Sequence, residues 1–287
     1  MAEPKWARGS NQYVKRSRPT AAGADREAKI GLSRSSSELR ELACGIRWDS
    51  AAIEFEKLKQ HGVDSARNRL RHVLPNFIWD AAALEGNTYT LPEVQTLLEG
   101  TTVGGRPVED AAQILALRDA FADLDHLVVN SIFALNKLTS DRLHSIVAEH
   151  EAIESGHFRG EGDVGGGGLV SLGALGLYRA STPGEGGQTL LDEHRTLMDY
   201  LTEVDDPREQ AIAYFCAAAR RQFYFDGNKR TARLMMSGHL LTHGYDAISI
   251  NATRRIEFNE HLSHLFDTGD ATGLMAFILD NRTKDAE

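Results

Sequence analysis

The sequence predicts an all-α fold. Apolar residues recur at helical spacing from about Trp48 onward, and no alternation of strands with helices occurs that would build an α/β sheet. Turn residues such as Gly, Pro, Asn and Asp separate the helical segments. The 287 residues are 41% hydrophobic and 25% charged, which is ordinary for a globular protein with a substantial core.

The charge distribution predicts a tail followed by a folded region. Residues 1–40 hold nine Lys/Arg against four Asp/Glu, whereas the whole chain has a formal net charge of -9. We expect a flexible basic tail at 1–45, a helical region at 46–107 and a core domain at 108–283. The acidic balance argues against a general nucleic-acid binder, so only the tail could contact nucleic acid or an acidic partner.

The cysteine usage and hydropathy indicate a cytoplasmic protein. Only Cys44 and Cys216 are present, with no spacing typical of a metal site, so a reducing compartment is expected. No run of about 18 apolar residues predicts a membrane span, and the N-terminus lacks the apolar stretch of a secretory signal. The sequence leaves the oligomeric state open, including a homo-oligomer.

The N-terminal helices follow from apolar faces and caps. Apolar spacing predicts helix up to Leu74, and Pro75 should kink the chain or open a new helix because proline lacks a backbone N–H. The segment 77–84 should be helical and end at Gly86-Asn87. Thr90 is a good N-cap for a further short helix.

The later helices are predicted in the same way. A wide apolar face predicts a long helix over 108–133, and Thr139-Ser-Asp141 should cap the next one. Pro207 should open a helix, because proline is favoured in the first turn. The remaining helices are expected at 190–201, at about 229–243 as a buried central helix, at 251–266 and at 272–279.

A glycine-rich segment interrupts the helices. Eleven of the 28 residues in 160–187 are Gly, a composition that cannot build a core. We predict a mobile loop with a short hairpin that pairs Leu169–Leu172 with Gly176–Arg179. Two interpretations stay open, a disordered linker and an active-site flap.

The segment Gln222–Arg233 is the most informative part of the sequence. A loop that ends at a helix start offers unpaired N–H groups and a positive dipole end, and Gly227 lets an anion approach closely. Arg230 and Arg233 are three residues apart on one helix face, and arginine forks suit phosphate oxygens. Asp226 beside a phosphate is a natural Mg²⁺ ligand. These residues indicate a site for a nucleotide and Mg²⁺, although a capped helix start with surface cations is the plainer alternative.

This segment resembles the Fic/Doc family motif His-x-Phe-x-Asp/Glu-Gly-Asn-Gly/Lys-Arg-x-x-Arg. The resemblance covers about residues 50–283 and implies a helical Fic fold with a small β-hairpin flap. It also implies transfer of AMP, or another phosphate-containing group, from ATP to a hydroxyl of a target protein. By this resemblance Asp226 binds Mg²⁺ and Tyr224 takes the slot usually held by Phe. The nucleotide-binding residues would be Gly227, Asn228, Lys229, Arg230 and Arg233, of which Asn228 and Arg230 are also catalytic.

A second segment resembles the family's inhibitory helix, whose pattern is Ser/Thr-x-x-x-Glu-Gly/Asn. Here Glu85, Gly86 and Asn87 match the end of the pattern, while Ala81 stands at the Ser/Thr position. The resemblance implies that Glu85 pairs with Arg233 and blocks the terminal phosphate of the nucleotide. The alternative is an ordinary polar residue near a helix end.

Two departures from the motif leave three functions open. Gln222 occupies the catalytic His position, and an amide cannot serve as a base, a loss typically worth about 10²- to 10⁴-fold in rate. His239 and His243 lie too far along the next helix to replace it. Lys229 stands where many AMP-transferring members have Gly and resembles the Doc branch. The sequence thus favours an autoinhibited, slow AMP transferase over a Doc-like phosphotransferase or a nucleotide-binding regulator without activity.

Overall fold

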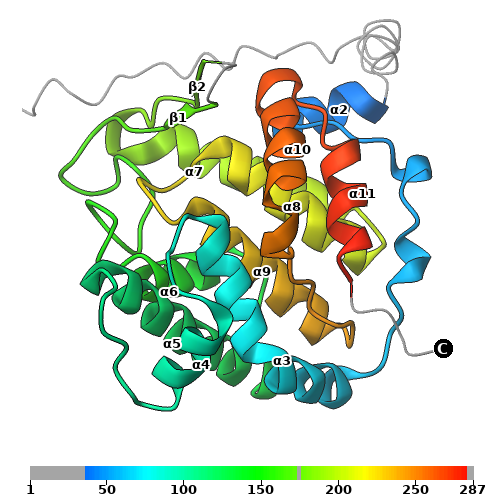
Figure 1. Cartoon of the computed structure of the whole chain (residues 1–287). Helices are drawn as coiled ribbons and strands as arrows, with labels where there is room; N and C mark the ends of the chain where they lie inside the picture. The colour runs from blue at the N-terminus through cyan, green and yellow to red at the C-terminus, as the bar shows by residue number, and fades with distance from the viewer. Residues whose placement is uncertain (1–35, 173–175, 283–287) are drawn as a thin grey trace, which may run out of the picture. The chain divides into compact units, whose positions relative to one another are not determined.

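The computed structural model describes residues 36–172 and 176–282 (Figure 1). The predicted tail 1–45 falls mostly outside these ranges, but its end does not. Residues 36–44, predicted as flexible, instead form helix α2 (Ser36–Cys44), in which Cys44 is buried. Arg40 of this helix bonds the Trp48 carbonyl at 2.7 Å, so α2 is tied to the folded region.

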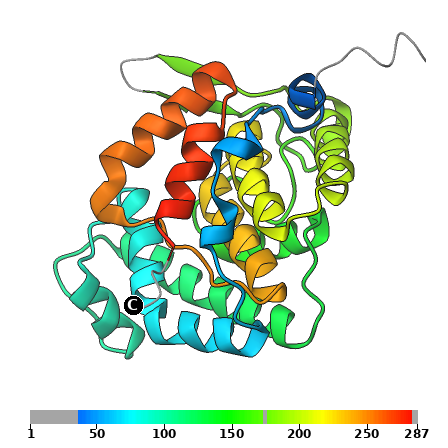
Figure 2. The ribbon, with the colours of Figure 1, turned by 90° about the vertical axis from the view of Figure 1, so that its right-hand side faces the viewer.

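The buried helix α9 (Asn228–Thr242) is the centre of the fold, as the sequence predicted (Figures 1 and 2). It packs against α3 (Val63–Leu84), α5 (Val108–Val129), α6 (Lys137–Val147) and α8 (Pro207–Arg221). At Gly238 a Cβ atom would lie 2.2 Å from the ring of Phe133, so only glycine allows this close packing. The N-terminal helices therefore share one hydrophobic core with the rest of the described chain.

Helix α3 excludes one of the two outcomes predicted at Pro75. A single helix runs from Val63 to Leu84 through the proline, and no new helix opens there. A proline inside a helix costs about 3 kcal/mol. Leu70 before it and Ile78 after it are both buried in the core, and this packing favours continuity on both sides. The helix ends at Leu84 with Glu85 as its C-cap, and Gly86 follows with a φ of 96°.

The short elements after α3 are set by their caps. Helix α4 (Leu91–Leu98) begins at the predicted Thr90, which forms a capping box with Glu93. Helix α5 ends at Val129, a turn earlier than expected. Helix α6 begins at Lys137, and its cap is Asn136 rather than Thr139–Asp141, because the Asn136 side chain accepts a hydrogen bond from the Thr139 N–H.

The glycine-rich segment forms the predicted hairpin. Strand β1 (Leu169–Ser171) pairs antiparallel with β2 (Leu177–Arg179), with Val170 opposite Tyr178. The base of the hairpin wraps a fully buried arginine, Arg159, which donates to the carbonyls of Gly166 and Ser181 at 2.8 and 3.1 Å. The neighbouring glycines pack directly on this side chain.

The C-terminal half completes the bundle. Helix α7 (Gln188–Thr202) and α8 precede the motif, and α10 (Arg255–Thr268) and α11 (Thr272–Asp280) follow α9, all close to the predicted positions. Short 3₁₀ turns occupy Ser50–Ala52, Phe55–Lys57, Glu185–Gly187 and Ala252–Arg254. No helix in the described part of the chain is both long and apolar enough to span a bilayer.

Candidate active site

The motif forms a tight loop between α8 and α9. Helix α8 ends at Gln222, which has a left-handed backbone with φ 53° and ψ 57°. Gly227 is the N-cap of α9 with φ 69°, and a Cβ there would lie 2.9 Å from Ala148. The side chain of Asn228 closes the loop, accepting from the Tyr224 N–H at 2.9 Å and donating to its carbonyl at 2.8 Å. The backbone N–H groups at the start of α9 thus point out of a rigid turn.

Gln222, at the predicted catalytic position, is bound to the loop by its own amide. Its Nε2 donates to the Ala219 carbonyl at 2.6 Å, and its Oε1 accepts from Asn228 at 3.1 Å. A left-handed conformation at a non-glycine residue is uncommon and often marks a functional site. The amide can orient a neighbour by hydrogen bonding but cannot accept a proton at neutral pH.

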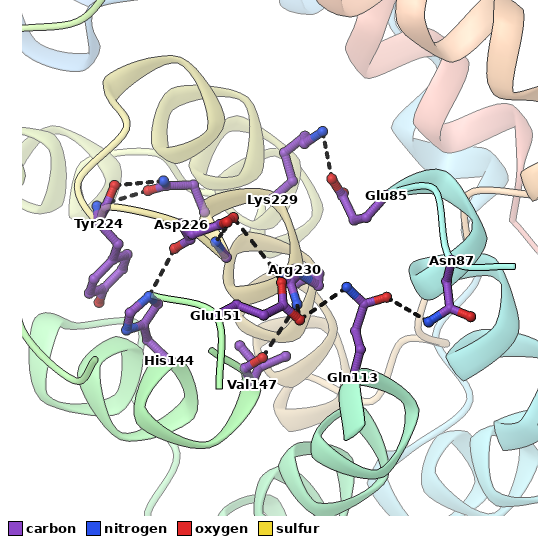
Figure 3. Close-up of polar contacts among 12 residues, drawn as sticks. Glu85, Asn87, Gln113, His144, Val147, Glu151, Tyr224, Asp226, Lys229 and Arg230 are labelled. Carbon is purple, nitrogen blue, oxygen red and sulfur yellow. Dashed lines mark hydrogen bonds and ion pairs between the residues drawn. The ribbon is translucent and has the colours of Figure 1, made fainter. Parts of the chain in front are cut away.

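A histidine that the sequence analysis did not single out lies under the loop. His144 of α6 stacks on the Tyr224 ring at 3.7 Å between centroids. Its Nε2 donates to the Asp226 carbonyl at 2.9 Å (Figure 3). Its Nδ1 accepts from the Gly156 N–H at 2.9 Å. Burial lowers the His144 pKa to about 4. Because the ring is neutral and both nitrogens are bonded, His144 holds the loop and is no replacement for the missing base.

His239, which is close to the motif in sequence, is also unable to replace the missing base. His239, in the last turn of α9, bonds the side chain of Gln210 at 2.7 Å, and burial lowers its pKa to about 3. Tyr224 fills the aromatic slot as the resemblance implied. Its extra hydroxyl donates to the Asp141 carboxylate at 2.8 Å and shares a hydrogen bond with the Ser140 hydroxyl at 2.7 Å, so the buried oxygen is satisfied.

A cavity of about 590 Å³ opens at the N-terminus of α9. The hairpin borders one side through β1, and α10 borders another. The motif loop and Glu85 complete the lining, so the hairpin lies where a flap over the site would lie. The lining residues are Glu85, Leu169, Val170, Ser171, Leu172, Gln222, Phe225, Asp226, Gly227, Asn228, Lys229, Arg230, Asn259, Leu262, Ser263 and Phe266.

Arg230, one of the two predicted phosphate arginines, is paired with a carboxylate that the sequence analysis missed. Glu151 accepts from Arg230 through both oxygens, at 2.7 and 2.6 Å. Gln113 donates to Glu151 at 3.1 Å, and Asn87 donates to Gln113 at 2.9 Å (Figure 3). A polar chain therefore links Arg230 to the turn that carries Glu85. No sequence signal marks Glu151, which follows α6 in an irregular segment.

Glu85 contacts Arg233, as the resemblance to the inhibitory helix implied. Its Oε1 accepts from Arg233 Nη1 at 3.1 Å. Its Oε2 lies 2.7 Å from Lys229 Nζ, a contact that the sequence analysis did not predict. Burial alone would raise the Glu85 pKa, but Arg233 and then Lys229 outweigh burial and hold this pKa below its usual value. The carboxylate is therefore charged at neutral pH.

The Ser/Thr position of the inhibitory pattern leaves a small gap beside Arg233. Ala81 and Arg233 line a second cavity of about 10 Å³. Arg233 is buried, and its Nε and Nη2 have no hydrogen-bond partner among the described residues. A hydroxyl at position 81 would place an acceptor in this cavity. Burial accordingly lowers the Arg233 pKa, although Glu85 acts in the opposite direction.

Asp226 has the exposure and charge that a cation bound together with a nucleotide requires. Its side chain is 59% exposed and lines the large cavity, with Oδ1 accepting from the Gly227 N–H at 2.6 Å. Within the described ranges no group of three or more His, Cys, Asp or Glu residues could hold a metal alone. One carboxylate plus phosphate oxygens is nevertheless a usual set for Mg²⁺, so the residues present fit a metal that arrives with a nucleotide.

Comparison with known proteins gives a consistent set of relatives. No family model matches the chain. Protein adenylyltransferase Fic from Drosophila mojavensis is 25% identical over 225 residues, which cover 77% of this chain and 42% of the relative. The same protein from Aedes aegypti is 27% identical over 209 residues, covering 71% and 39%. The chain thus spans less than half the length of these relatives.

Solved structures with the same fold carry the same family name. A Fic domain containing signaling protein from Bacteroides thetaiotaomicron has a TM-score of 0.61 at 20% identity, with 79% of this chain and 86% of that chain covered. Fic-1 from C. elegans has a TM-score of 0.61 at 18% identity, with 91% and 69% covered.

In sequence and in fold, the chain is similar to Fic family proteins. The all-α prediction and the expected Fic fold with its small hairpin are both confirmed.

Proposed function

We propose that this protein transfers AMP from ATP to a hydroxyl group of a target protein. The observation that carries the proposal is the cavity of about 590 Å³ at the N-terminus of α9, whose wall is the motif loop. A helix start with several cations beside a cavity of this size is suited to a nucleotide polyphosphate. The adenylyltransferase relatives support the same reaction class.

The motif residues have distinct roles in this proposal. The N–H groups of Gly227, Asn228 and Lys229 bind phosphate oxygens, and Arg230 and Arg233 neutralise the distal phosphates. Asp226 holds Mg²⁺, which supplies charge neutralisation on the phosphates when bound. The target hydroxyl oxygen forms a bond to the α-phosphorus, and the bond to pyrophosphate breaks.

Gln222 makes the transfer slow. The attacking hydroxyl must lose its proton, and the amide has no pKa that allows it to accept one. Asp226 and Glu85 are the only carboxylates among the cavity-lining residues of the described chain. In this proposal both are engaged, one with Mg²⁺ and the other with Arg233 and Lys229. The proton therefore leaves to solvent or to the nucleotide without the help of a tuned base.

Glu85 keeps the resting protein inhibited. Its carboxylate lines the cavity and lies between two cations that a terminal phosphate would need. A phosphate approaching the same cations is repelled by the like charge. ATP therefore binds productively only after Glu85 has moved away.

Two alternatives each have one supporting observation. Lys229, which projects into the same cavity, favours a Doc-like phosphoryl transfer, in which the γ-phosphate rather than AMP is moved. Gln222, whose amide bonds Ala219 and Asn228 and cannot act as a base, favours a nucleotide-binding regulator without activity.

Labelled ATP separates the three functions. The wild type, a Glu85→Gly variant and a control Glu99→Gly variant are incubated with Mg²⁺, cell lysate and either α- or γ-labelled ATP. We expect the α label on protein, at a higher level with Glu85→Gly and unchanged with Glu99→Gly, because Glu99 lies outside the cavity. Transfer of only the γ label supports the Doc-like reaction. ATP binding without transfer of either label supports the regulator.

A further inference from the structure

We propose that Lys229 has two anionic partners in turn, the Glu85 carboxylate in the resting protein and a nucleotide phosphate once Glu85 has left. Lys229 is then both a second anchor of the inhibitory glutamate and a cation held in reserve for the substrate. The inference rests on the proposed function, because it assumes that a polyphosphate occupies the cavity.

The resting contact engages both oxygens of one carboxylate. Oε1 of Glu85 accepts from Arg233 at 3.1 Å. Its Oε2 lies 2.7 Å from the Lys229 ammonium (Figure 3). Lys229 and Arg233 are four residues apart on α9, so both can reach one side chain that approaches the helix. Glu85 is therefore held at two points, and losing either cation leaves it with one.

The two cations differ in their access to the cavity. The Lys229 side chain is 31% exposed and lines the cavity together with Glu85, whereas the Arg233 side chain is 8% exposed and is not among the lining residues. Lysine also carries its charge on a flexible four-carbon stem. When Glu85 withdraws, Lys229 needs no rearrangement of the fold to turn toward a ligand beside Gly227 and Asn228.

The charge balance of the site supports the same assignment. Arg230 is partly neutralised by Glu151 through two short hydrogen bonds, so it offers a phosphate less net positive charge than an unpaired cation would. Lys229 and Arg233 remain, and in the resting protein Glu85 is the carboxylate that both of them contact. A departing Glu85 leaves two positive charges at a helix N-terminus, an arrangement that attracts an anion.

A double role has a measurable consequence. Removing the Lys229 charge weakens phosphate binding in the open state, but it also loosens the closed state that competes with ATP. The two effects oppose each other in the wild type. When Glu85 is neutral there is no closed state to loosen, so only the loss of the phosphate contact remains.

A double-mutant cycle tests this consequence. The wild type, Glu85→Gln, Lys229→Met and the double variant are titrated with Mg-ATP by calorimetry, and their thermal unfolding is measured without nucleotide. In the Glu85→Gln background, Lys229→Met should weaken ATP binding about tenfold, the usual worth of a charge-assisted hydrogen bond. In the wild-type background the factor by which Lys229→Met weakens ATP binding should be at least about threefold smaller. This difference is the coupling expected of a partly exposed ion pair. An equal loss in both backgrounds would overturn the proposal.

Two controls separate a specific contact from general charge. Lys229→Arg retains a positive charge, so it should retain at least part of the contact with Glu85 and part of the contact with the phosphate. Lys57→Met removes one positive charge from an exposed pair with Glu54 and should leave ATP binding unchanged. If Lys57→Met weakens binding as much as Lys229→Met, long-range charge explains the result and the proposal fails.

The same data distinguish failure of this inference from failure of the proposed function. If no variant binds Mg-ATP, both the proposed function and the phosphate role of Lys229 are wrong. If ATP binds and Glu85→Gln has no effect on its affinity, the inhibitory role of Glu85 is wrong. Additive effects of the two substitutions on thermal unfolding would show that Lys229 does not anchor Glu85, whatever the ATP result.

Discussion

Gln222 is the residue whose identity most affects the activity of the site. Its backbone lies in the left-handed region at the end of α8, and its amide bonds both Ala219 and Asn228. The loop around it is otherwise complete, with Asn228, Gly227 and the buried Tyr224 in ordered contacts. The motif residues that shape the loop are thus retained, whereas the residue that would act as a base is replaced by Gln222.

We expect Gln222→His to raise AMP transfer by about 10²-fold or more, because an imidazole with a pKa near neutrality can deprotonate the target hydroxyl. Histidine is among the residues that tolerate a left-handed backbone, so the loop should accept it. The measurement is α-label transfer by the variant in a Glu85→Gly background. Mg-ATP affinity should change little, because the Gln222 side chain bonds Ala219 and Asn228 and is not one of the cations that hold the phosphates.

Two outcomes would contradict this expectation. If the parent already transfers AMP as fast as the His variant, Gln222 is competent or another group removes the proton. If the His variant binds Mg-ATP but transfers nothing, AMP transfer is the wrong reaction for this site.

The glycine-rich segment is organised at the scale of the element by one arginine. Arg159 is fully buried and donates to the Gln222 carbonyl at 2.7 Å as well as to the two carbonyls at the base of the hairpin. Gly167 and Gly168 have positive φ, and a Cβ at either would lie 2.8 Å from this side chain. The glycine run therefore has a steric cause, and Arg159 couples the hairpin to the motif loop.

Arg159→Lys should lower the free energy of unfolding by about 2–4 kcal/mol, because a lysine cannot donate to all three buried carbonyls at once. The hairpin should also become more sensitive to limited proteolysis within 160–187 than the helices are. Urea unfolding and proteolysis check both effects. Arg195→Lys is the matched control, since Arg195 is 68% exposed on α7. Equal effects of the two substitutions would refute the role given to Arg159.

At the scale of the whole molecule, three buried histidines make stability depend on pH. Burial lowers the pKa of His144 and His194 to about 4 and that of His239 to about 3, all below the ordinary value of 6.5. In the unfolded chain these rings take up protons near pH 6.5, while in the folded protein they stay neutral. The contribution of these neutral histidines to the free energy of unfolding is therefore fully present above pH 6.5, and it is lost as the pH falls toward 4.

We expect the free energy of unfolding to fall by up to about 4 kcal/mol per pH unit below pH 6.5, at about 1.4 kcal/mol for each histidine. Urea unfolding at several pH values between 7.5 and 5 measures this slope. His194→Phe should reduce the slope by up to about a third, because the ring packs among Phe158, Phe223 and Tyr214 and its Nε2 has no hydrogen-bond partner within the described residues.

The sequence by itself determined the helices and the motif loop. Apolar periodicity, Thr90 and Pro207 act over a few residues, so their effect can be read from neighbours along the chain. The motif is contiguous for the same reason, and its turn geometry follows from Gly227 and Asn228. The cap of α6 was wrong in the prediction because a competing cap at Asn136 decides it. Of the two outcomes predicted at Pro75, the opening of a new helix does not occur.

Only the tertiary structure decided which side chains surround the motif. Glu151 meets Arg230 across 79 residues of chain, and His144 meets Asp226 across 82. The pairing of Glu85 with Arg233 was expected only from the family resemblance, and its second partner Lys229 was not expected at all. Such contacts depend on how α3 and α6 pack against α9. A residue's place on its own helix gives the face it occupies but not the partner that this face meets.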